Sequence, residues 1–158
     1  MELFDENNNR KYSQQTLINA YENMEWTNNE GEFNFPDGDF FYMVFESAKE
    51  DAEQLVKDLF LDIYLIDSFF QQDSDEFYIA GFIFRNNVVI INYWAKKVNA
   101  ESSVEIYKDG GKWYCTGFGA IKYVHPVCVN DFPNGYPHSY FKTELVSDGY
   151  YKYLKILN

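Results

Sequence analysis

The sequence is poor in the residues that most often hold metal ions and form disulfides. Its 158 residues include only 2 cysteines and 2 histidines. Two thiols cannot build the disulfide framework of a small secreted protein, so we expect reduced cysteines and a cytoplasmic location. The longest apolar runs, such as residues 88–91, are far shorter than the ~20 residues that cross a bilayer, and the acidic start of the chain lacks the pattern of a signal peptide.

Sequence motifs of the best-known enzyme classes are also missing. The segment Gly117-Phe118-Gly119 lacks the third glycine of a dinucleotide-binding loop, and residues 110–112 lack the spacing of a P-loop. We find no nucleophile elbow, no zinc-protease histidine pair and no calcium-binding EF-hand loop. These absences predict that the protein is not an enzyme and uses no cofactor.

Basic residues are scarce in the first half of the chain. The formal net charge is −12, and residues 1–80 hold 19 Asp and Glu against 4 Lys and Arg, which gives 4 − 19 = −15. Residues 81–158 hold 6 acidic and 9 basic residues, which gives 9 − 6 = +3. An acidic surface does not bind nucleic acid or anionic membranes directly, because phosphate contacts need Lys and Arg. Its natural complement is a basic protein partner, and acidity that serves solubility alone is the competing interpretation.

Aromatic residues, in contrast, are plentiful. Phe, Tyr and Trp make up 20% of the chain, which does not suit a disordered acidic tail and favours a sheet-rich core. The length fits a single domain, residues 1–158. Helical patterns come first and strand patterns follow, so we predict an α+β fold with two N-terminal helices packed on a mostly antiparallel, meander-type sheet.

Two helices are predicted in the first half. Ser13 is placed to cap a helix that ends near residue 26. Ser47 and Glu50 have the spacing of a capping box and predict the start of a second helix. Its apolar stripe continues to about residue 64, with a strand over residues 61–66 as the competing interpretation.

Most strands are predicted in the second half, after one that precedes the second helix. Gly110 and Gly111 accept positive φ, so the segment Asp109-Gly110-Gly111 predicts a tight hairpin. Residues 126–139 contain three prolines and are expected to be irregular. The predicted strands cover residues 40–45, 77–84, 88–94, 103–108, 112–116, 121–125, 140–146 and 150–157.

Acidic and aromatic residues are interspersed in and beside residues 27–39, which glycine and proline mark as a loop. Interfaces favour an aromatic anchor inside a charged rim, so this segment is the predicted partner-binding site. A second acidic stretch lies at residues 73–76. The competing interpretation places the aromatic residues in the core. The predicted contact residues are Glu22, Glu25, Trp26, Glu30, Glu32, Phe33, Asp37, Asp39, Asp73 and Asp75.

All cysteine and histidine in the chain falls within one stretch, as Cys115, His125, Cys128 and His138. Two Cys and two His suffice for tetrahedral zinc, but this spacing matches no known zinc finger. Cys115 is expected in a strand, where a small buried thiol is the usual finding. We therefore predict no metal site and keep these four residues as the alternative, a metal-binding protein or a small enzyme.

In size, acidity and absence of catalytic motifs, the whole chain resembles the immunity proteins of bacterial toxin–immunity pairs, including those of contact-dependent inhibition systems. The resemblance implies an inhibitor that masks the basic active-site surface of a cognate toxin domain, frequently a nuclease. A nucleic-acid mimic shares these electrostatics, but it needs acids spaced like phosphates along an extended face. The strong core pattern favours the immunity-type inhibitor over this mimic.

Overall fold

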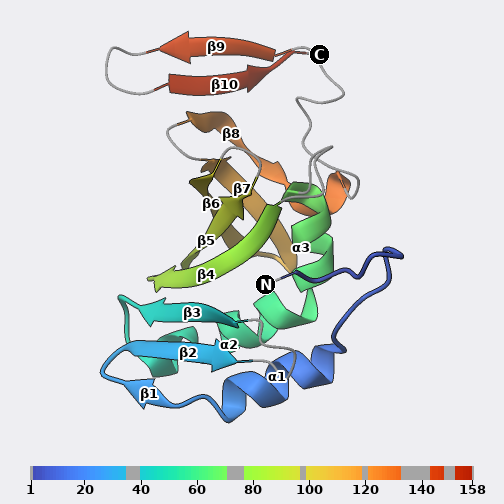
Figure 1. The fold of residues 1–158 in the computed structure, drawn as a ribbon. Coiled ribbons are helices and arrows are strands. Elements are labelled where there is room, and N and C mark those ends of the chain that lie inside the picture. The colour runs from blue at the N-terminus through green and yellow to red at the C-terminus, as the bar shows by residue number, and fades with distance from the viewer. Residues whose placement is uncertain are drawn as a thin grey trace.

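The computed structural model describes residues 2–34, 40–70, 77–96, 99–118, 121–132, 143–147 and 152–157. The elements in chain order are α1 (Gln14–Glu22), β1 (Trp26–Thr27), β2 (Glu30–Asn34), β3 (Phe40–Phe45), α2 (Lys49–Leu61), α3 (Ile63–Phe70), β4 (Phe77–Arg85), β5 (Val88–Ala95), β6 (Ala100–Asp109), β7 (Lys112–Phe118), β8 (Ile121–Cys128), a 3-10 turn (Val129–Asp131), β9 (Thr143–Ser147) and β10 (Lys152–Ile156). The chain is an α+β protein (Figure 1). Within the described ranges, no helix has the length and apolar character that a bilayer crossing requires.

The described strands form one sheet with the order β1-β2-β3-β4-β5-β6-β7-β8-β10-β9. Two junctions are parallel, β3 with β4 and β8 with β10. All other neighbours run antiparallel, so the sheet is mostly antiparallel as predicted. Helices α2 and α3 lie between β3 and β4 in the chain and supply the long connection that a parallel pair needs.

One face of the sheet packs against the helices and forms the core, and we call it the inner face. Buried and half-buried residues alternate along β5, as the pleat of a strand requires. Phe60 of α2 meets Phe82 of β4 with ring centroids 6.1 Å apart, and Phe70 of α3 lies 5.7 Å from Tyr93 of β5. These buried residues belong to one apolar cluster that includes side chains of α1.

A polar contact fastens α2 to the sheet within this core. Asp62, the residue after α2, accepts a hydrogen bond at 2.9 Å from the indole Nε1 of Trp113, whose side chain is fully buried. Lys108 Nζ lies 3.6 Å from carboxylate oxygens of both Asp58 and Asp62. A buried indole N–H without an acceptor is costly, so Asp62 satisfies a donor that apolar packing alone would leave open.

The helices differ from the prediction at three points. The described residues contain three helices rather than two, β1 and β2 precede α2 in addition to the predicted strand over residues 40–45, and α1 ends at Glu22 rather than near residue 26. Ser13 does cap α1, because its hydroxyl accepts a hydrogen bond from Thr16 N–H at 3.1 Å. Ser47 does not cap α2, so the predicted capping box is wrong. Strand pairing continues to Glu46, whose N–H donates to the Phe84 carbonyl, and the cap position moves on to Ala48.

The second predicted helix is two helices. α2 ends at Leu61, where the N–H of Asp62 bonds back to the carbonyls of Asp58 and Leu59, and α3 begins at Ile63. The competing strand over residues 61–66 is wrong, since these residues belong to the two helices and their junction.

The predicted strands match β3–β8 and, in their described parts, β9 and β10. Gly110 and Gly111 have φ of 57° and 80°, as the predicted hairpin requires. Two segments predicted to be irregular contain strand in their described parts. Residues 27–34 of the first belong to the β1–β2 hairpin, and β8 continues through residues 126–128 of the second before the 3-10 turn at Val129–Asp131.

Candidate functional site

The β1–β2 hairpin fixes the position of the acidic residues predicted as contacts. Its two-residue turn places Asn28 at φ 56°, a left-handed conformation that asparagine tolerates. Asn29 then ties the turn to the end of β3. Its side-chain Nδ2 donates to the Phe45 carbonyl at 2.6 Å, and its own carbonyl accepts from Phe45 N–H at 2.8 Å. The hairpin is thereby held in a set orientation relative to β3.

Trp26 supports this hairpin from the inner face. Its ring packs against Phe45 with centroids 4.9 Å apart, and Lys49 Nζ lies 4.6 Å from the Trp26 ring centroid. Gly31 is opposite Trp26 in the β1–β2 ladder, and a Cβ there would come within 3.0 Å of the indole and of the Met24 sulfur. Trp26 is half-buried in this packing, which agrees with the competing interpretation that the aromatic residues serve the core.

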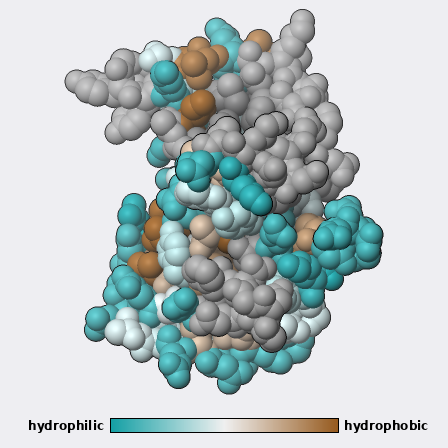
Figure 2. Space-filling model, viewed as in Figure 1, coloured by the Kyte–Doolittle hydropathy of each residue, from teal (hydrophilic) through white to brown (hydrophobic). Residues whose placement is uncertain are grey.

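The opposite face of the sheet, which we call the open face, is half-exposed and largely apolar. Antiparallel sheets with one solvated face normally carry polar side chains there, so apolar residues on such a face point to a contact surface. Figure 2 shows brown apolar atoms at the side of the molecule where β4 ends. The half-buried residues of the open face are Tyr42, Val44, Tyr78, Ile83, Val88, Ile90, Asn92, Trp94, Ser103, Glu105, Tyr107, Tyr114 and Cys128.

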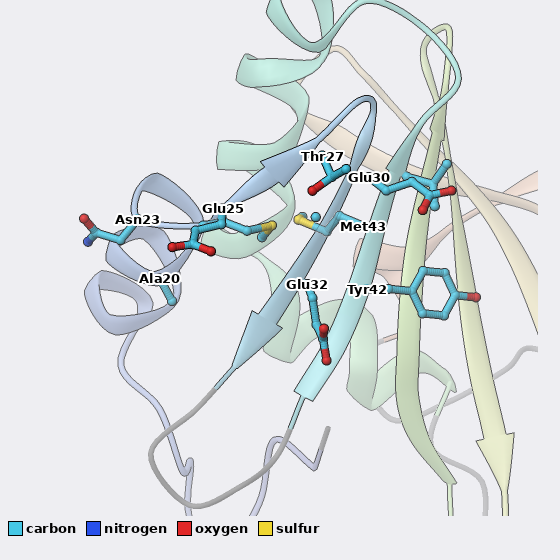
Figure 3. Close-up of a pocket in the computed structure, with 11 residues that line it drawn as sticks. Ala20, Asn23, Glu25, Thr27, Glu30, Glu32, Tyr42 and Met43 are labelled. Atoms are coloured by element: carbon cyan, nitrogen blue, oxygen red, sulfur yellow. The ribbon is translucent and has the colours of Figure 1, made fainter.

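A groove of about 890 Å³ wraps round the hairpin edge of the sheet. β1 pairs with β2 only at Gly31 and Glu30, so beyond this short ladder the two segments diverge and leave space between them. Asn23 and Glu25 lie on the α1 side of this edge, whereas Glu30 and Tyr42 project to the open face (Figure 3). The lining residues are Ala20, Asn23, Met24, Glu25, Thr27, Glu30, Gly31, Glu32, Tyr42, Met43 and Val44.

Three exposed glutamates, Glu25, Glu30 and Glu32, line this groove. None of them forms an ion pair with a residue that the structure describes. Uncompensated carboxylates that share a concave surface build a negative potential, which attracts cations.

Two cations near this edge of the sheet are engaged elsewhere. Lys49 covers the Trp26 ring on the inner face. Arg85, at the end of β4, donates a hydrogen bond to Glu46, and this bond lowers the pKa of the Glu46 carboxyl and raises that of the guanidinium. Neither residue lines the groove.

The structure brings only some of the predicted contact residues together. Glu25, Glu30 and Glu32 share the groove, whereas Glu22 is exposed in the last turn of α1 and outside the lining. Phe33 lies in β2 opposite Phe41. Asp37, Asp39, Asp73 and Asp75 lie outside the described residues.

Sequence reasoning missed the residues that give the groove its apolar wall and floor. Met24 follows α1, while Tyr42 and Met43 come from β3. Alternation within residues 40–45 predicts that Tyr42 and Val44 share one face, but it does not predict which strand lies beside them. That information comes from the register of β2 against β3.

The sheet separates the two cysteines of the alternative metal site. Tyr114 pairs with Cys128 and the next residue, Cys115, pairs with Val127, so the two thiols point to opposite faces. Burial raises the pKa of the Cys115 thiol to about 12, which disfavours the thiolate that zinc needs. His125 is exposed on β8, and His138 lies outside the described residues. No group of three or more Cys, His, Asp or Glu in the described ranges is arranged to hold a metal ion.

Comparison with models of known protein families, with curated proteins and with solved structures finds no match to this chain.

Proposed function

We propose that this protein is an inhibitory binding protein of the immunity type, which covers the basic surface of a partner protein with its acidic groove. The observation that carries the proposal is the set of glutamates Glu25, Glu30 and Glu32 around a groove with apolar walls, none of which has an ion pair among the described residues. Apolar walls beside charged groups are the composition of protein interfaces. The hairpin that holds Glu30 and Glu32 is tied to β3 through Asn29, so the charges are presented without a large entropic cost.

The proposed action requires no chemistry. A toxin domain that binds nucleic acid holds Lys and Arg in its cleft to contact phosphates. Glutamates that pair with those cations take the place of the substrate phosphates, and the hairpin blocks the cleft by its bulk. Opposite potentials also speed the encounter and exclude partners of the wrong charge.

The test is a charge reversal with a matched control. Glu25→Lys, Glu30→Lys and Glu32→Lys are combined in one groove variant. The control combines Glu2→Lys, Glu6→Lys and Glu144→Lys, three other exposed glutamates outside the groove lining, and so adds the same charge. The partner is captured from the native host with tagged wild-type protein, and association rates of all three proteins are then measured over a range of salt concentrations.

We expect the groove variant to associate at least ~10-fold more slowly at low salt and to lose most of its salt dependence, because steering raises association rates by about 10- to 1000-fold. The control variant should keep most of the wild-type rate. Equal slowing by both variants would assign the effect to net charge rather than to the groove, and an unchanged rate in the groove variant would refute the proposal.

A further inference from the structure

We infer that the open face of the sheet is the docking surface for an amphipathic helix with basic flanks, supplied by a partner protein. The inference rests on the proposed function for the basic character of the partner. The docking site is the part of the open face between β2 and β6, and the partner segment that binds there is a helix. This part of the open face meets the acidic groove at Glu30 and Tyr42.

One row of side chains across five strands carries the pattern that such a helix needs. In the strand register Glu30 of β2 is beside Val44 of β3, and Val44 is beside Ile83 of β4. Ile83 in turn pairs with Ile90 of β5, and Ile90 pairs with Glu105 of β6. Paired positions lie on the same face of a sheet, so the row has three aliphatic side chains in the middle and a glutamate at each end.

The spacing of this row suits one helix. Four strand intervals separate Glu30 from Glu105, which is about 19 Å. A helix with its side chains is about 10–12 Å wide, so about 4 Å remains on each side. Lysine and arginine bridge such a gap, because their apolar stems lie along the surface while the charged ends reach outward.

The apolar side chains of the open face between the two acidic margins form a strip that runs along β5, and we call it the apolar strip. Its length also fits a short helix. On β5 the open-face positions run from Val88 to Trp94, a distance of about 20 Å. A helix of about 14 residues has this length. Trp94 closes the strip with a half-buried indole, and a large aromatic side chain of this kind is typical of residues that dominate binding energy.

Near the middle of the apolar strip the side chains rise little above the sheet backbone, so a helix can approach closely. Tyr42 is beside Gly81, and a Cβ at Gly81 would lie 2.5 Å from the Tyr42 ring, so the ring lies across the backbone of β4. Asn92 of β5 donates a hydrogen bond to the Tyr42 hydroxyl and fixes the ring there. The Tyr42 ring thus lies flat against the backbone of β4 on the open face.

Glutamates on β2 and β6 form an acidic margin on each side of the apolar strip, and they favour a helix with basic residues on both of its flanks. Glu32 adds to the margin at β2, and Glu101, which pairs with Trp94, adds to the margin at β6. No ion pair joins Glu30, Glu32 or Glu101 to a residue that the structure describes. Glu105 is oriented by the Thr116 hydroxyl, which lies 3.2 Å from its carboxylate. A helix with Lys or Arg on both flanks pairs with all four carboxylates.

The described helices pack on the inner face and do not form a layer on the open face. The described helices α1, α2 and α3 contribute to the core on the inner face. A sheet with two apolar faces is stabilised when a second layer of helix covers the exposed one. The acidic margins disfavour the described helices of a second copy as that layer, because α1, α2 and α3 all belong to the acidic first half of the chain.

The test uses a synthetic probe of known sequence. A fluorescein-labelled peptide of about 14 residues, made of two Leu-Lys-Lys-Leu-Leu-Lys-Leu heptads, is titrated with the full chain and followed by fluorescence anisotropy. The control peptide carries Glu in place of every Lys. We expect saturable 1:1 binding of the lysine peptide and none of the glutamate peptide.

Matched variants locate the binding. Ile90→Lys puts a positive charge at the centre of the strip, and Gln54→Lys puts the same charge on the exposed side of α2. We expect Ile90→Lys to weaken the lysine peptide by at least ~10-fold and Gln54→Lys by less than ~2-fold, since losses at an interface concentrate at its centre. Circular dichroism checks the fold, and Ser103→Lys on β6 replaces Ile90→Lys if that variant does not fold.

The remaining results overturn the inference. Equal weakening by Ile90→Lys and Gln54→Lys would show that the peptide is attracted by net charge alone. Absence of lysine-peptide binding would show that the apolar strip does not bind a basic amphipathic helix. The captured partner separates this inference from the proposed function. Partner binding that survives Ile90→Lys but is lost in the groove variant supports the groove and refutes the open face. Partner binding that is lost in Ile90→Lys but survives Glu25→Lys, which changes a groove residue outside the margins of the strip, supports the open face and refutes the groove.

Discussion

Replacing Asp62 with alanine tests how α2 is fastened to the sheet. Asp62 accepts the 2.9 Å hydrogen bond from the indole of Trp113 and lies 3.6 Å from Lys108 Nζ. Alanine leaves the N–H of a fully buried indole without an acceptor, which costs about 1–3 kcal/mol. The ion pair adds only about 0.5 kcal/mol, because the Asp62 side chain is 36% exposed and water screens its charge. We therefore expect Asp62→Ala to lower the free energy of unfolding by about 1.5–3.5 kcal/mol.

Urea unfolding, followed by circular dichroism and by tryptophan fluorescence, measures this loss. For a chain of this length each 1 kcal/mol corresponds to about 2–4 °C in Tm, so Asp62→Ala should melt roughly 3–14 °C below the wild type. Asp62→Asn is the matched control. Its amide oxygen still accepts the indole hydrogen bond while the charge is removed, so its loss should stay below about 1 kcal/mol.

Two results would refute this reasoning. If Asp62→Asn is as unstable as Asp62→Ala, the charge rather than the hydrogen bond holds the helix, and Lys108→Met should then cost as much as either. If Asp62→Ala loses less than about 0.5 kcal/mol, the indole N–H has found another acceptor and the contact does not fasten α2.

Two further predictions concern buried titratable groups. The Tyr21 hydroxyl is buried without a hydrogen-bond partner among the described residues, so Tyr21→Phe should match or exceed wild-type stability at pH 7 in urea unfolding. Burial, with smaller contributions from Glu53 and Glu22, raises the pKa of Tyr21 from 10.0 to about 12, so above pH 10 the unfolded chain loses this proton before the native state does. Wild-type stability should therefore fall as the pH rises from 10 to 12, and a Tyr21→Phe curve that falls just as steeply would contradict the assignment. Burial likewise raises the pKa of the Cys115 thiol to about 12, whereas Cys128 is only half-buried. Iodoacetamide at pH 8, followed by mass spectrometry, should therefore label Cys128 well before Cys115. Similar labelling rates would contradict the core position of Cys115.

The fold was predictable where local pattern and tertiary structure agree. Asp109-Gly110-Gly111 demands a tight turn in any context, and the strands around it were found. Ser47 shows the opposite case. Its spacing to Glu50 is right for a capping box, but the pairing of Glu46 with Phe84 on β4 carries the chain one residue further before the helix begins. A contact between residues so far apart in the chain leaves no local signal.

The candidate site was predictable in composition but not in geometry. Glu25, Glu30 and Glu32 were singled out by their charge, yet residues 27–39 were assigned to a loop because glycine and proline punctuate them, and the strand β2 within them was missed. The Asn28-Asn29 turn is a hairpin signal, although a less familiar one than Asn-Gly. The row from Glu30 to Glu105 joins five strands, and only their register reveals it.

The position of β10 between β8 and β9 fixes an order of assembly at that edge of the sheet. β9 comes first in the chain, but its pairing partner is β10, which docks on β8 through Lys152–Leu154. During synthesis β9 must therefore wait, unpaired, until the ribosome has delivered the strand that follows it. Leu145 and Val146 of β9 are 53% and 39% exposed even in the finished fold, so they are open to wrong partners throughout that wait. A chain that stops after Ser147 would lose two strands from the sheet, although it lacks the residues of only one.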